Sequence, residues 1–499
     1  MIVDKLPSSV NPVRSPARWI EWLRVLFALL AIGTGLVIAL SVGEFGPLIL
    51  LVIPLLFMLL LALGQPQLGL VGLIIITFTQ LSNVGIIYHG LPSMAQPLAA
   101  LLILLIIVRF ALFGERPEGW LRAGPLLLIY ALVWFAALLH AGNFQAASAA
   151  FIGFVKDALG AVIVIFFIQK PASFKGAVWA VIFAGLLMGA VCVFQTLTGT
   201  FANNYFGFGG WQLQNSGAVT NHRLTGPYTN PNAFAQVLVF IVPLTIDRLW
   251  HERNLTLRVF AGAAALVSIL TVIFTYSRGG LLALVFTIGL LVALRRPNFL
   301  FLLLTVFLAI GVIQFLPTTY NSRILTLLQF TDVQGGQLSD KSFRGRTSEN
   351  TAAWRMFLDN PLLGVGLGNF SVNYQDYSRT IGLDTRRDQR SPASLYMELL
   401  SEQGFVGTVI FFWLMAMIFR ELNFSWKNFI QSGLTDEGYM ILAITAGFAG
   451  YLFAGITKNS AYSNVFWVIV GIAMASGQVA HSSRLKAEEL SGNQPGYDV

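Results

Sequence analysis

The chain has 499 residues, of which 56% are hydrophobic and only 11% are charged, and its formal net charge is +8. This composition is too apolar for a soluble domain, so cytosolic enzymes and soluble binding modules are excluded. A single cysteine excludes a disulfide framework and a cysteine-based zinc site. The basic excess does not indicate nucleic-acid binding, because Lys and Arg are spread over loops without stacking aromatics on one face.

Apolar runs long enough to cross a bilayer recur along most of the chain, so the sequence predicts an all-α integral membrane protein. The polar segment 1–24 lacks a convincing cleavage site, which indicates a cytoplasmic tail rather than a removed signal peptide. We expect about 12–14 transmembrane helices. The candidate spans are 25–42, 47–63, 68–88, 95–113, 124–142, 150–169, 174–197, 233–248, 258–276, 279–294, 299–316, 397–419, 437–455 and 464–480.

Basic residues concentrate on one side of these predicted spans, and the short loops on the other side are nearly free of Lys and Arg. Cytoplasmic loops carry such an excess, so the pattern predicts that both termini are cytoplasmic. Two long outer loops then divide the chain, and neither an inverted repeat nor a broken-helix pair stands out. The expected segments are a tail at 1–24, an N-terminal bundle at 25–197, a first periplasmic loop at 198–232, core helices at 233–316, a large periplasmic loop at 317–396, C-terminal helices at 397–480 and a cytoplasmic tail at 481–499.

The first outer loop ends in a turn sequence, Asn230-Pro231-Asn232, directly before an apolar helix. We expect Asn232 to cap a helix that begins at Ala233. The free N–H groups of a helix start attract anions, and Arg223 nearby would add a phosphate clamp. The alternative is an arginine solvated on an ordinary turn. The position of Arg223 beside a capped helix at the membrane surface favours anion binding.

A second arginine, Arg278, lies between two apolar runs in the sequence Ser277-Arg278-Gly279-Gly280. A charge at that depth is costly unless it is paired or faces water. The two glycines allow the backbone to break or to approach another group closely. Arg278 is therefore either a functional cation or an interfacial residue that reaches toward lipid headgroups.

The large outer loop is rich in arginine, which suits an anionic, lipid-linked substrate. Within it, 347–358 reads as an amphipathic helix. Gly364, Gly366 and Gly368 do not have the spacing of a dinucleotide-binding loop, so we expect a tight turn against the membrane face. The basic residues of this loop are Arg323, Lys341, Arg344, Arg346, Arg355, Arg379, Arg386, Arg387 and Arg390.

Two carboxylates, Glu398 and Glu402, follow at the start of the next predicted span. Their spacing of four residues puts both on one helix face. They are candidates for a general base and its helper. Equally, they are candidates for salt bridges with the loop arginines or for stabilising the helix N-terminus.

Together these segments resemble the O-antigen ligase and polymerase superfamily of bacterial envelope enzymes, most closely from Phe260 to Gly407. The resemblance rests on Arg223 with the turn Gly226 to Asn232, Ser277-Arg278-Gly279-Gly280, Arg346 with Trp354 upstream of Pro361-Leu362-Leu363-Gly364-Val365-Gly366, and Ser394-Leu395-Tyr396 followed by Glu398 and Glu402 to Gly407. Each motif is weak alone, and their order with the large outer loop makes the set specific.

The resemblance implies a GT-C-like membrane glycosyltransferase of the bacterial inner membrane. Such enzymes take a glycan from undecaprenyl pyrophosphate on the periplasmic face and pass it to a lipid A core, a growing polysaccharide or a protein. They act in lipopolysaccharide or exopolysaccharide biosynthesis and use neither a metal nor another cofactor. By analogy, Arg223, Arg278 and Arg346 hold the diphosphate, with Arg344 or Arg355 in support. Arginine forks would stabilise a departing pyrophosphate in this way.

One position departs from the family pattern. Members carry a histidine just before the Asn/Ser–Leu–Tyr step, as a candidate catalytic base, and here that position is Ala393. Either Glu398, Glu402 or His222 takes its role, or the activity has been lost or changed. The sequence favours an enzyme. The alternatives are an inactive member that binds lipid-linked glycan in an export assembly, or a transporter of small, bicarbonate-like anions.

Overall fold

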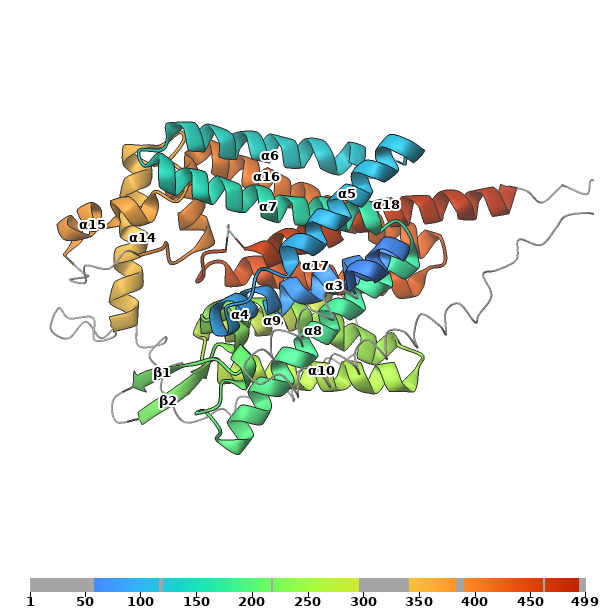
Figure 1. Ribbon diagram of the computed structural model, residues 1–499, viewed down its shortest axis with the longest axis horizontal. Helices are drawn as coiled ribbons and strands as arrows, with labels where there is room; N and C mark the ends of the chain where they lie inside the picture. The colour runs from blue at the N-terminus through green and yellow to red at the C-terminus, as the bar shows by residue number, and fades with distance from the viewer. Residues whose placement is uncertain are drawn as a thin grey trace, which may run out of the picture.

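The computed structural model describes residues 58–115, 120–216, 219–295, 341–382, 390–460 and 463–492. The predicted spans 25–42 and 299–316, and most of 47–63, lie outside the described residues. Within the described part, the helices of the bundle lie side by side, most of them roughly along the long axis of the molecule (Figure 1). They are α3 (Pro66–Phe78), α4 (Leu81–His89), α5 (Ala95–Phe113), α6 (Trp120–His140), α7 (Phe144–Phe167), α8 (Pro171–Thr198), α9 (Pro231–His251), α10 (Leu255–Phe274), α11 (Arg278–Arg295), α16 (Leu395–Gln431), α17 (Thr435–Ala454) and α18 (Asn464–Gly492).

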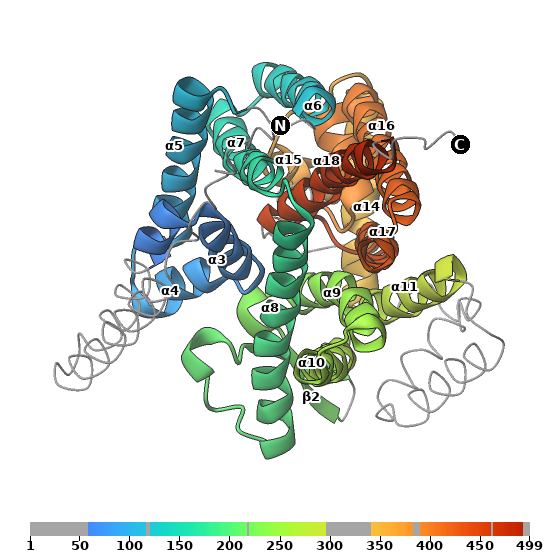
Figure 2. The ribbon, with the colours of Figure 1, turned by 90° about the vertical axis from the view of Figure 1, so that its right-hand side faces the viewer.

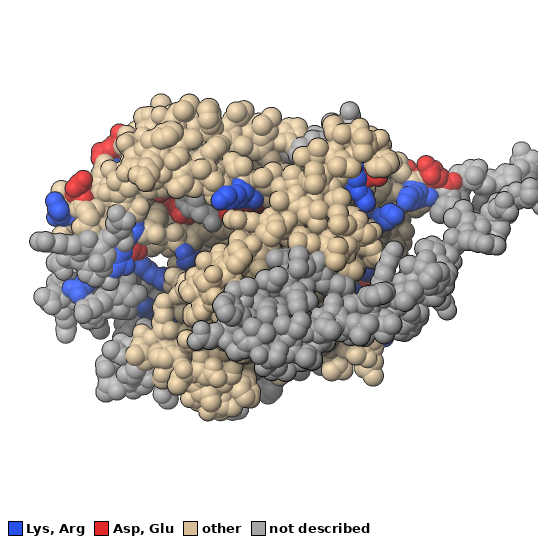
Figure 3. Space-filling model, viewed as in Figure 1, with Lys and Arg blue, Asp and Glu red and all other residues tan. Residues whose placement is uncertain are grey.

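The prediction of an all-α integral membrane protein is confirmed. Of the described helices, nine are long and apolar enough to cross a membrane, or ten if the bent pair α3 and α4 forms one span. Each predicted span in this part coincides with a helix or with that bent pair. On the face shown in Figure 3, charged side chains gather toward the two ends, apart from a small patch near the middle. An apolar middle between charged ends fits a bilayer.

Helices α8, α9, α17 and α18 form the centre of the bundle (Figure 2). In the most apolar window of α9, 78% of residues are buried inside the protein, and in α18 89%, whereas α5 at the periphery buries 11%. Glycines let the central helices approach closely, as is common in membranes. A Cβ at Gly447 would lie 2.6 Å from the carbonyl oxygen of Phe240, and one at Gly450 would overlap Thr287 of α11. The bundle therefore has a rigid centre from which the loops extend.

The span predicted at 68–88 is broken, with a bend of 56° between α3 and α4. Gln80 takes a positive φ of 53° at the break, and its side-chain amide donates to Asn464 at 3.1 Å. The Tyr228 hydroxyl donates to the carbonyl of Phe78, which the break leaves without a helix partner. The expectation of no broken-helix pair was therefore wrong. No Gly or Pro marks the site, because contacts from distant segments stabilise it.

Helix α16 is longer than the predicted span 397–419 and continues through Arg420 and Lys427, which the sequence had placed in a loop. It is interrupted at Gly404, whose φ is 65° and ψ −160°. There, two N–H groups of α16 donate to carbonyl oxygens of the loop segment before α15 instead of to carbonyls of their own helix. The N–H of Phe405 donates to the carbonyl of Pro361 at 2.8 Å, and that of Val406 to Leu362 at 3.2 Å. The large loop is thus joined to α16 through the backbone.

Both of the long loops that the sequence predicts on the outer side contain secondary structure. The first holds the 3₁₀ turns η2 (Tyr205–Gly207) and η3 (Gly226–Tyr228), and an antiparallel hairpin of β1 (Trp211–Ser216) and β2 (Val219–Leu224), in which Gln212 pairs with Arg223. These strands were not predicted from the sequence, because they are short and lack an apolar run. The second loop holds α14 (Lys341–Asp359) and α15 (Phe370–Ile381), so the amphipathic helix predicted at 347–358 is confirmed and begins earlier.

The α14–α15 pair has a small core of its own, in which Ala352, Ala353 and Met356 pack against Phe370 and Tyr374. Between the two helices, Gly364, Gly366 and Gly368 have φ values of 69°, 94° and 63°. The predicted tight glycine turn is confirmed. Side chains at these positions would collide with neighbouring backbone, since a Cβ at Gly366 would lie 2.5 Å from the Cα of Ala141. The turn therefore docks the second loop onto the α6–α7 connection.

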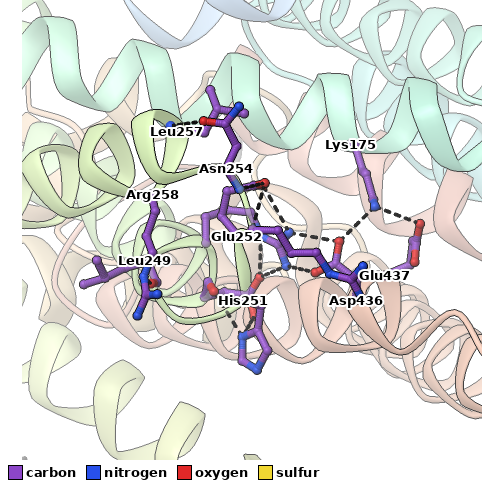
Figure 4. A network of polar contacts seen from close by, with 12 residues as sticks. Lys175, Leu249, His251, Glu252, Asn254, Leu257, Arg258, Asp436 and Glu437 are labelled. Atoms are coloured by element: carbon purple, nitrogen blue, oxygen red, sulfur yellow. Dashed lines mark hydrogen bonds and ion pairs between the residues drawn. The ribbon is translucent and has the colours of Figure 1, made fainter.

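Charged residues at the end of the bundle opposite to these loops form a compact ion-pair network (Figure 4). Arg248 of α9 is fully buried and contacts Asp247 at 2.6 Å and Asp436 of α17 at 2.9 Å. Lys175 of α8 contacts Asp436 at 2.9 Å and Glu437 at 3.2 Å. Buried charges are retained in proteins when they are paired in this way. The network fastens α8, α9 and α17 to one another.

Candidate functional site

Three connections meet at one end of the bundle, where Figure 1 shows β1, β2 and α14 on the left. They are the first outer loop, the second outer loop, and the short connection between α17 and α18. A cavity of about 240 Å³ lies there. Most of its lining residues have a polar group in the side chain, and the lining consists of Tyr228, Ala233, Gln236, Val237, Glu398, Tyr451, Lys458, Asn459, Ser460 and Ser463.

Glu398 enters this cavity from the first turn of α16. Ser394 caps the helix, with its hydroxyl oxygen accepting from the N–H of Tyr396 at 3.3 Å. The N–H of Leu395 also donates to the carbonyl of Gly455 at 2.8 Å, which ties the start of α16 to the α17–α18 connection. Glu398 is only 3% exposed, and one of its oxygens accepts from the Asn459 amide at 3.3 Å. A buried carboxylate in a polar cavity is a candidate for proton transfer.

Lys458 shares the cavity with Glu398, and the sequence analysis missed it. Its ammonium donates to the carbonyl oxygen of Asn459 at 2.7 Å and also contacts the side-chain oxygen of that residue. Burial lowers the pKa of Lys458, attraction to Glu398 opposes that shift, and Arg346 of α14 adds to it. A signal was present in the sequence, because a lysine stands out among short outer loops that otherwise have almost no basic residues.

Arg223 is held by two segments that are remote from it in the sequence. Its Nε donates to the carbonyl of Thr275 at 2.9 Å, and its Nη2 donates to the side-chain oxygen of Asn232 at 3.2 Å. Asn232 was expected to cap α9, and that expectation was wrong. The cap is Asn230, whose side-chain oxygen accepts from the N–H groups of Asn232 and Ala233 at 2.9 and 3.3 Å. Proline is favoured at the first helical position, so α9 begins at Pro231, two residues earlier than predicted.

Because Asn232 is not the cap, its side chain is available to organise the start of α11. The hydroxyl of Ser277 donates to the same Asn232 oxygen at 2.8 Å and accepts from the N–H of Gly280 at 3.1 Å. Arg278 is therefore the first residue of α11 and is half-buried there. A Cβ at Gly279 would overlap Thr457, so α11 begins directly against the α17–α18 connection that carries Lys458. The first and third connections are linked through these contacts.

The loop arginines occupy different places on α14. Arg346 is half-buried, and its charge acts on Lys458, so it lies beside the cavity. Arg344 is half-buried two residues earlier. Arg355 is exposed and donates to the Thr380 hydroxyl at 2.8 Å, which fastens α14 to α15. Of the two arginines expected in support, Arg344 lies nearer in the chain to Arg346, and the contact of Arg355 favours a structural role.

The carboxylate of Glu402 is engaged by the backbone of the second loop. One oxygen accepts from the N–H of Gly368 at 3.0 Å, and the other accepts from the N–H of Phe370 at 3.2 Å. Phe370 begins α15, so Glu402 acts at a helix N-terminus, where a negative charge is favourable. Glu402 does not line the cavity. These contacts favour the structural alternative that the sequence left open for this residue.

His222 lies in an aromatic cluster of the first loop. Its ring stacks on Phe201 with centroids 4.1 Å apart and meets Trp211 edge-on at 4.6 Å. Neighbouring residues of a strand point to opposite faces, so His222 faces away from the side on which Arg223 contacts Thr275 and Asn232. His222 does not line the cavity either. Among the three candidate bases, only Glu398 does.

Ala393 precedes the cap of α16 by one residue and is half-buried. Its methyl group takes no proton, so the position offers steric space but no acid–base chemistry. The nearest carboxylate in the chain that lines the cavity is Glu398, one helical turn into α16. The geometry therefore provides a proton acceptor at the same end of the same helix.

Comparison with known proteins identifies a family for part of this site, in which Glu398 is the one cavity-lining residue. Residues 263–412 match the family model described as O-Antigen ligase, a range that includes the start of α11, all of α14 and α15, and Glu398. No curated protein matches the chain. The family implies lipid-linked glycan substrates and supports a glycosyltransferase-like role at the membrane in polysaccharide or lipopolysaccharide biosynthesis. This match supports a place for the segment 263–412 in the O-antigen ligase superfamily.

Proposed function

We propose that the chain transfers a glycan from undecaprenyl pyrophosphate to an acceptor hydroxyl, as a ligase or a polymerase does. The observation that carries this proposal is the buried Glu398 carboxylate in a cavity that Lys458 also lines, with Arg346 of α14 near enough to act on Lys458. A site of this kind combines a proton acceptor with cations for a leaving phosphate. Those are the two requirements of glycosyl transfer from a pyrophosphate.

In the proposed reaction, the acceptor oxygen attacks the anomeric carbon of the donor sugar. The proton of the acceptor hydroxyl passes to Glu398 as the new carbon–oxygen bond forms. The bond between the anomeric carbon and the pyrophosphate oxygen breaks, and its electron pair leaves with the lipid pyrophosphate. Glu398 then returns its proton to water or to the product. The negative charge that develops on the leaving oxygen is the charge that nearby cations must stabilise.

Arg223, Arg278 and Arg346 are the proposed ligands of the pyrophosphate, with Arg344 in support. Arg223 and Arg278 are joined through Asn232 and Ser277, so their backbones have a fixed relation. Arg346 approaches from the opposite loop, beside Lys458. Arginine binds phosphate oxygens with two parallel N–H donors, which suits a diphosphate better than a single lysine does. The outer, periplasmic location of this end remains part of the proposal.

The direct test is release of lipid pyrophosphate by the purified protein in lipid discs. The donor is an undecaprenyl-pyrophosphate oligosaccharide, and the buffer contains a chelator. We expect release by the wild type, loss of release in Arg223→Ala, and a strong reduction in Glu398→Gln. Arg355→Ala is the matched arginine control, because its contact with Thr380 lies outside the cavity. Equal release by wild type and Glu398→Gln would remove Glu398 as the base.

An inactive, glycan-binding member is the second candidate, and Ala393 favours it. The two candidates differ in one measurement, which is release by the Ala393→His variant. If the wild type binds the donor without releasing pyrophosphate and Ala393→His releases it, the chain is a family member that has lost its catalytic activity. If the wild type releases pyrophosphate, Ala393→His is not needed for activity and the first candidate stands.

The bent α3–α4 pair favours a third candidate, transport of a small anion, because broken helices line the sites of many transporters. The break contacts Tyr228, which lines the cavity. Bicarbonate flux into liposomes that contain the protein tests this role. Flux above that of empty liposomes, together with no release of lipid pyrophosphate, would replace the glycosyltransferase proposal.

A further inference from the structure

Asn459 connects the two charged residues of the cavity. Its amide nitrogen donates to the Glu398 carboxylate at 3.3 Å, and its side-chain and main-chain oxygens both accept from the Lys458 ammonium. An amide that donates with its nitrogen and accepts with its oxygen can have only one orientation between a carboxylate and an ammonium. The three side chains therefore form an ordered row, from the cation through the amide to the carboxylate.

From this row we infer that Lys458 and Asn459 are positioning residues for Glu398. Asn459 orients the carboxylate toward the cavity, and Lys458 supplies the positive charge that keeps it ionised and able to accept a proton. This inference rests on the proposed function, in which Glu398 is the base. It assigns the α17–α18 connection, which lies outside the matched range 263–412, a part in the reaction.

The charged and titratable groups that face Glu398 come from four other elements. Lys458 belongs to the α17–α18 connection, Arg346 to α14, Tyr451 to α17 and Tyr130 to α6, and the charge of Glu398 acts on Lys458, Tyr451 and Tyr130. Tyr228 of η3 also lines the cavity. The tyrosines are neutral near pH 7. The cations beside a single carboxylate therefore determine its charge state.

Burial alone would favour the protonated form of a carboxyl group that is 3% exposed. A neutral acid cannot take a proton from an acceptor hydroxyl, so a buried Glu398 needs compensation to act as a base. An opposite charge within a few ångströms and a hydrogen bond to the charged form both favour ionisation. Lys458 lines the same cavity and attracts Glu398 electrostatically, and Asn459 supplies the hydrogen bond. Because Ala393 has no proton acceptor, the cavity can take a proton from an acceptor hydroxyl only if Lys458 and Asn459 keep Glu398 ionised.

The first experiment is the pH profile of lipid-pyrophosphate release. Lys458→Met keeps the length of the side chain and removes its charge, so the acid limb of the profile should move up by about one pH unit. Lys458→Arg retains the charge and should leave the limb in place. Lys486→Met removes an exposed charge near the other end of α18 and is the matched control. An unshifted acid limb in a folded Lys458→Met protein would overturn the inference.

The second experiment does not depend on activity, so it separates failure of the inference from failure of the proposed function. Infrared spectroscopy of the protein in lipid discs follows the carbonyl band of protonated carboxyl groups with pH, and Glu398→Gln identifies the band that belongs to Glu398. Its midpoint should rise in Lys458→Met and rise further in Asn459→Asp, which puts a second carboxylate beside it. Identical midpoints in wild type and Lys458→Met would overturn the inference even if the enzyme is active. The expected shifts without release by the wild type would retain the charge coupling and reject the glycosyltransferase.

Discussion

The guanidinium of Arg223 donates to the side-chain oxygen of Asn232 at 3.2 Å, which fixes strand β2 to the first turn of α9. The same oxygen accepts from Ser277, so a single amide group sets the positions of two connections that carry proposed phosphate ligands. Arg223 itself is half-buried at the protein surface, where a free guanidinium would have several rotamers. Asn232 therefore pre-organises an arginine that would otherwise have to be ordered by the substrate.

Asn232→Ala should lower lipid-pyrophosphate release while leaving membrane insertion normal. A hydrogen bond to a charged group is worth about 1.5–3 kcal/mol, which corresponds to roughly a 10- to 100-fold loss of rate. The matched control is Asn254→Ala. Asn254 also lies at a helix start, where it caps α10 at the other end of the bundle through the N–H groups of Thr256 and Leu257. Comparable losses of rate in both variants would show that the effect is one of general stability.

The glycine turn of the second loop should be intolerant of side chains. Gly364→Ala places a Cβ 2.5 Å from the carbonyl oxygen of Ser401 at a φ of 69°. Gly382 has nearly the same φ of 70° but open space around it, so Gly382→Ala isolates the conformational cost alone. We expect Gly382→Ala to cost about 1 kcal/mol and Gly364→Ala to cost more than that, through displacement of the loop from α16. Thermal unfolding in lipid discs measures both, and equal Tm values would contradict close docking of the turn.

The membrane helices could be predicted from the sequence because their signal is local. Apolar runs of sufficient length predict each span. The turn at Gly364, Gly366 and Gly368 follows from the freedom of glycine to adopt a positive φ. The break at Gln80 and the continuation of α16 beyond Arg420 could not be predicted in this way. The first depends on contacts with Tyr228 and Asn464, and the second on packing of the whole helix.

The candidate site, too, could be predicted from the sequence only in part, because its remaining features depend on distant contacts. Glu398 was a candidate from its place in the sequence, but nothing local separated it from Glu402, which has the same residue type on the same helix face. Their difference lies in the partners, Asn459 for one and the backbone of Gly368 and Phe370 for the other. Lys458 lies 60 residues from Glu398 in the chain, so only the fold brings the two together.

Glu398→Gln and Glu402→Gln should have opposite profiles of activity and stability. In Glu402→Gln, the amide nitrogen would face the N–H of Gly368 or of Phe370, and one buried donor would lose its acceptor. That costs about 1–3 kcal/mol and should lower the Tm, with release per folded molecule largely retained. Glu398→Gln should keep the Tm and lose release. The opposite result, an inactive but stable Glu402→Gln, would transfer the role of base to Glu402.

Arg248→Met should destabilise the protein strongly without affecting the site. Arg248 is fully buried, and its removal leaves the buried Asp247 and the partly exposed Asp436 with fewer positive partners. Breaking a buried ion pair by removing one partner costs about 3–5 kcal/mol.

Lys175→Met is the matched control, because the Lys175 side chain is 39% exposed and contacts Asp436 in the same network. A partly exposed pair contributes about 1 kcal/mol or less, and Lys175 also contacts the buried Glu437, so the Tm of Lys175→Met should fall less than that of Arg248→Met. Because α9 separates this network from the cavity by its full length, release per folded molecule should equal that of the wild type in both variants. A selective loss of release in folded Arg248→Met protein would instead mean that the two ends of α9 are coupled during the reaction.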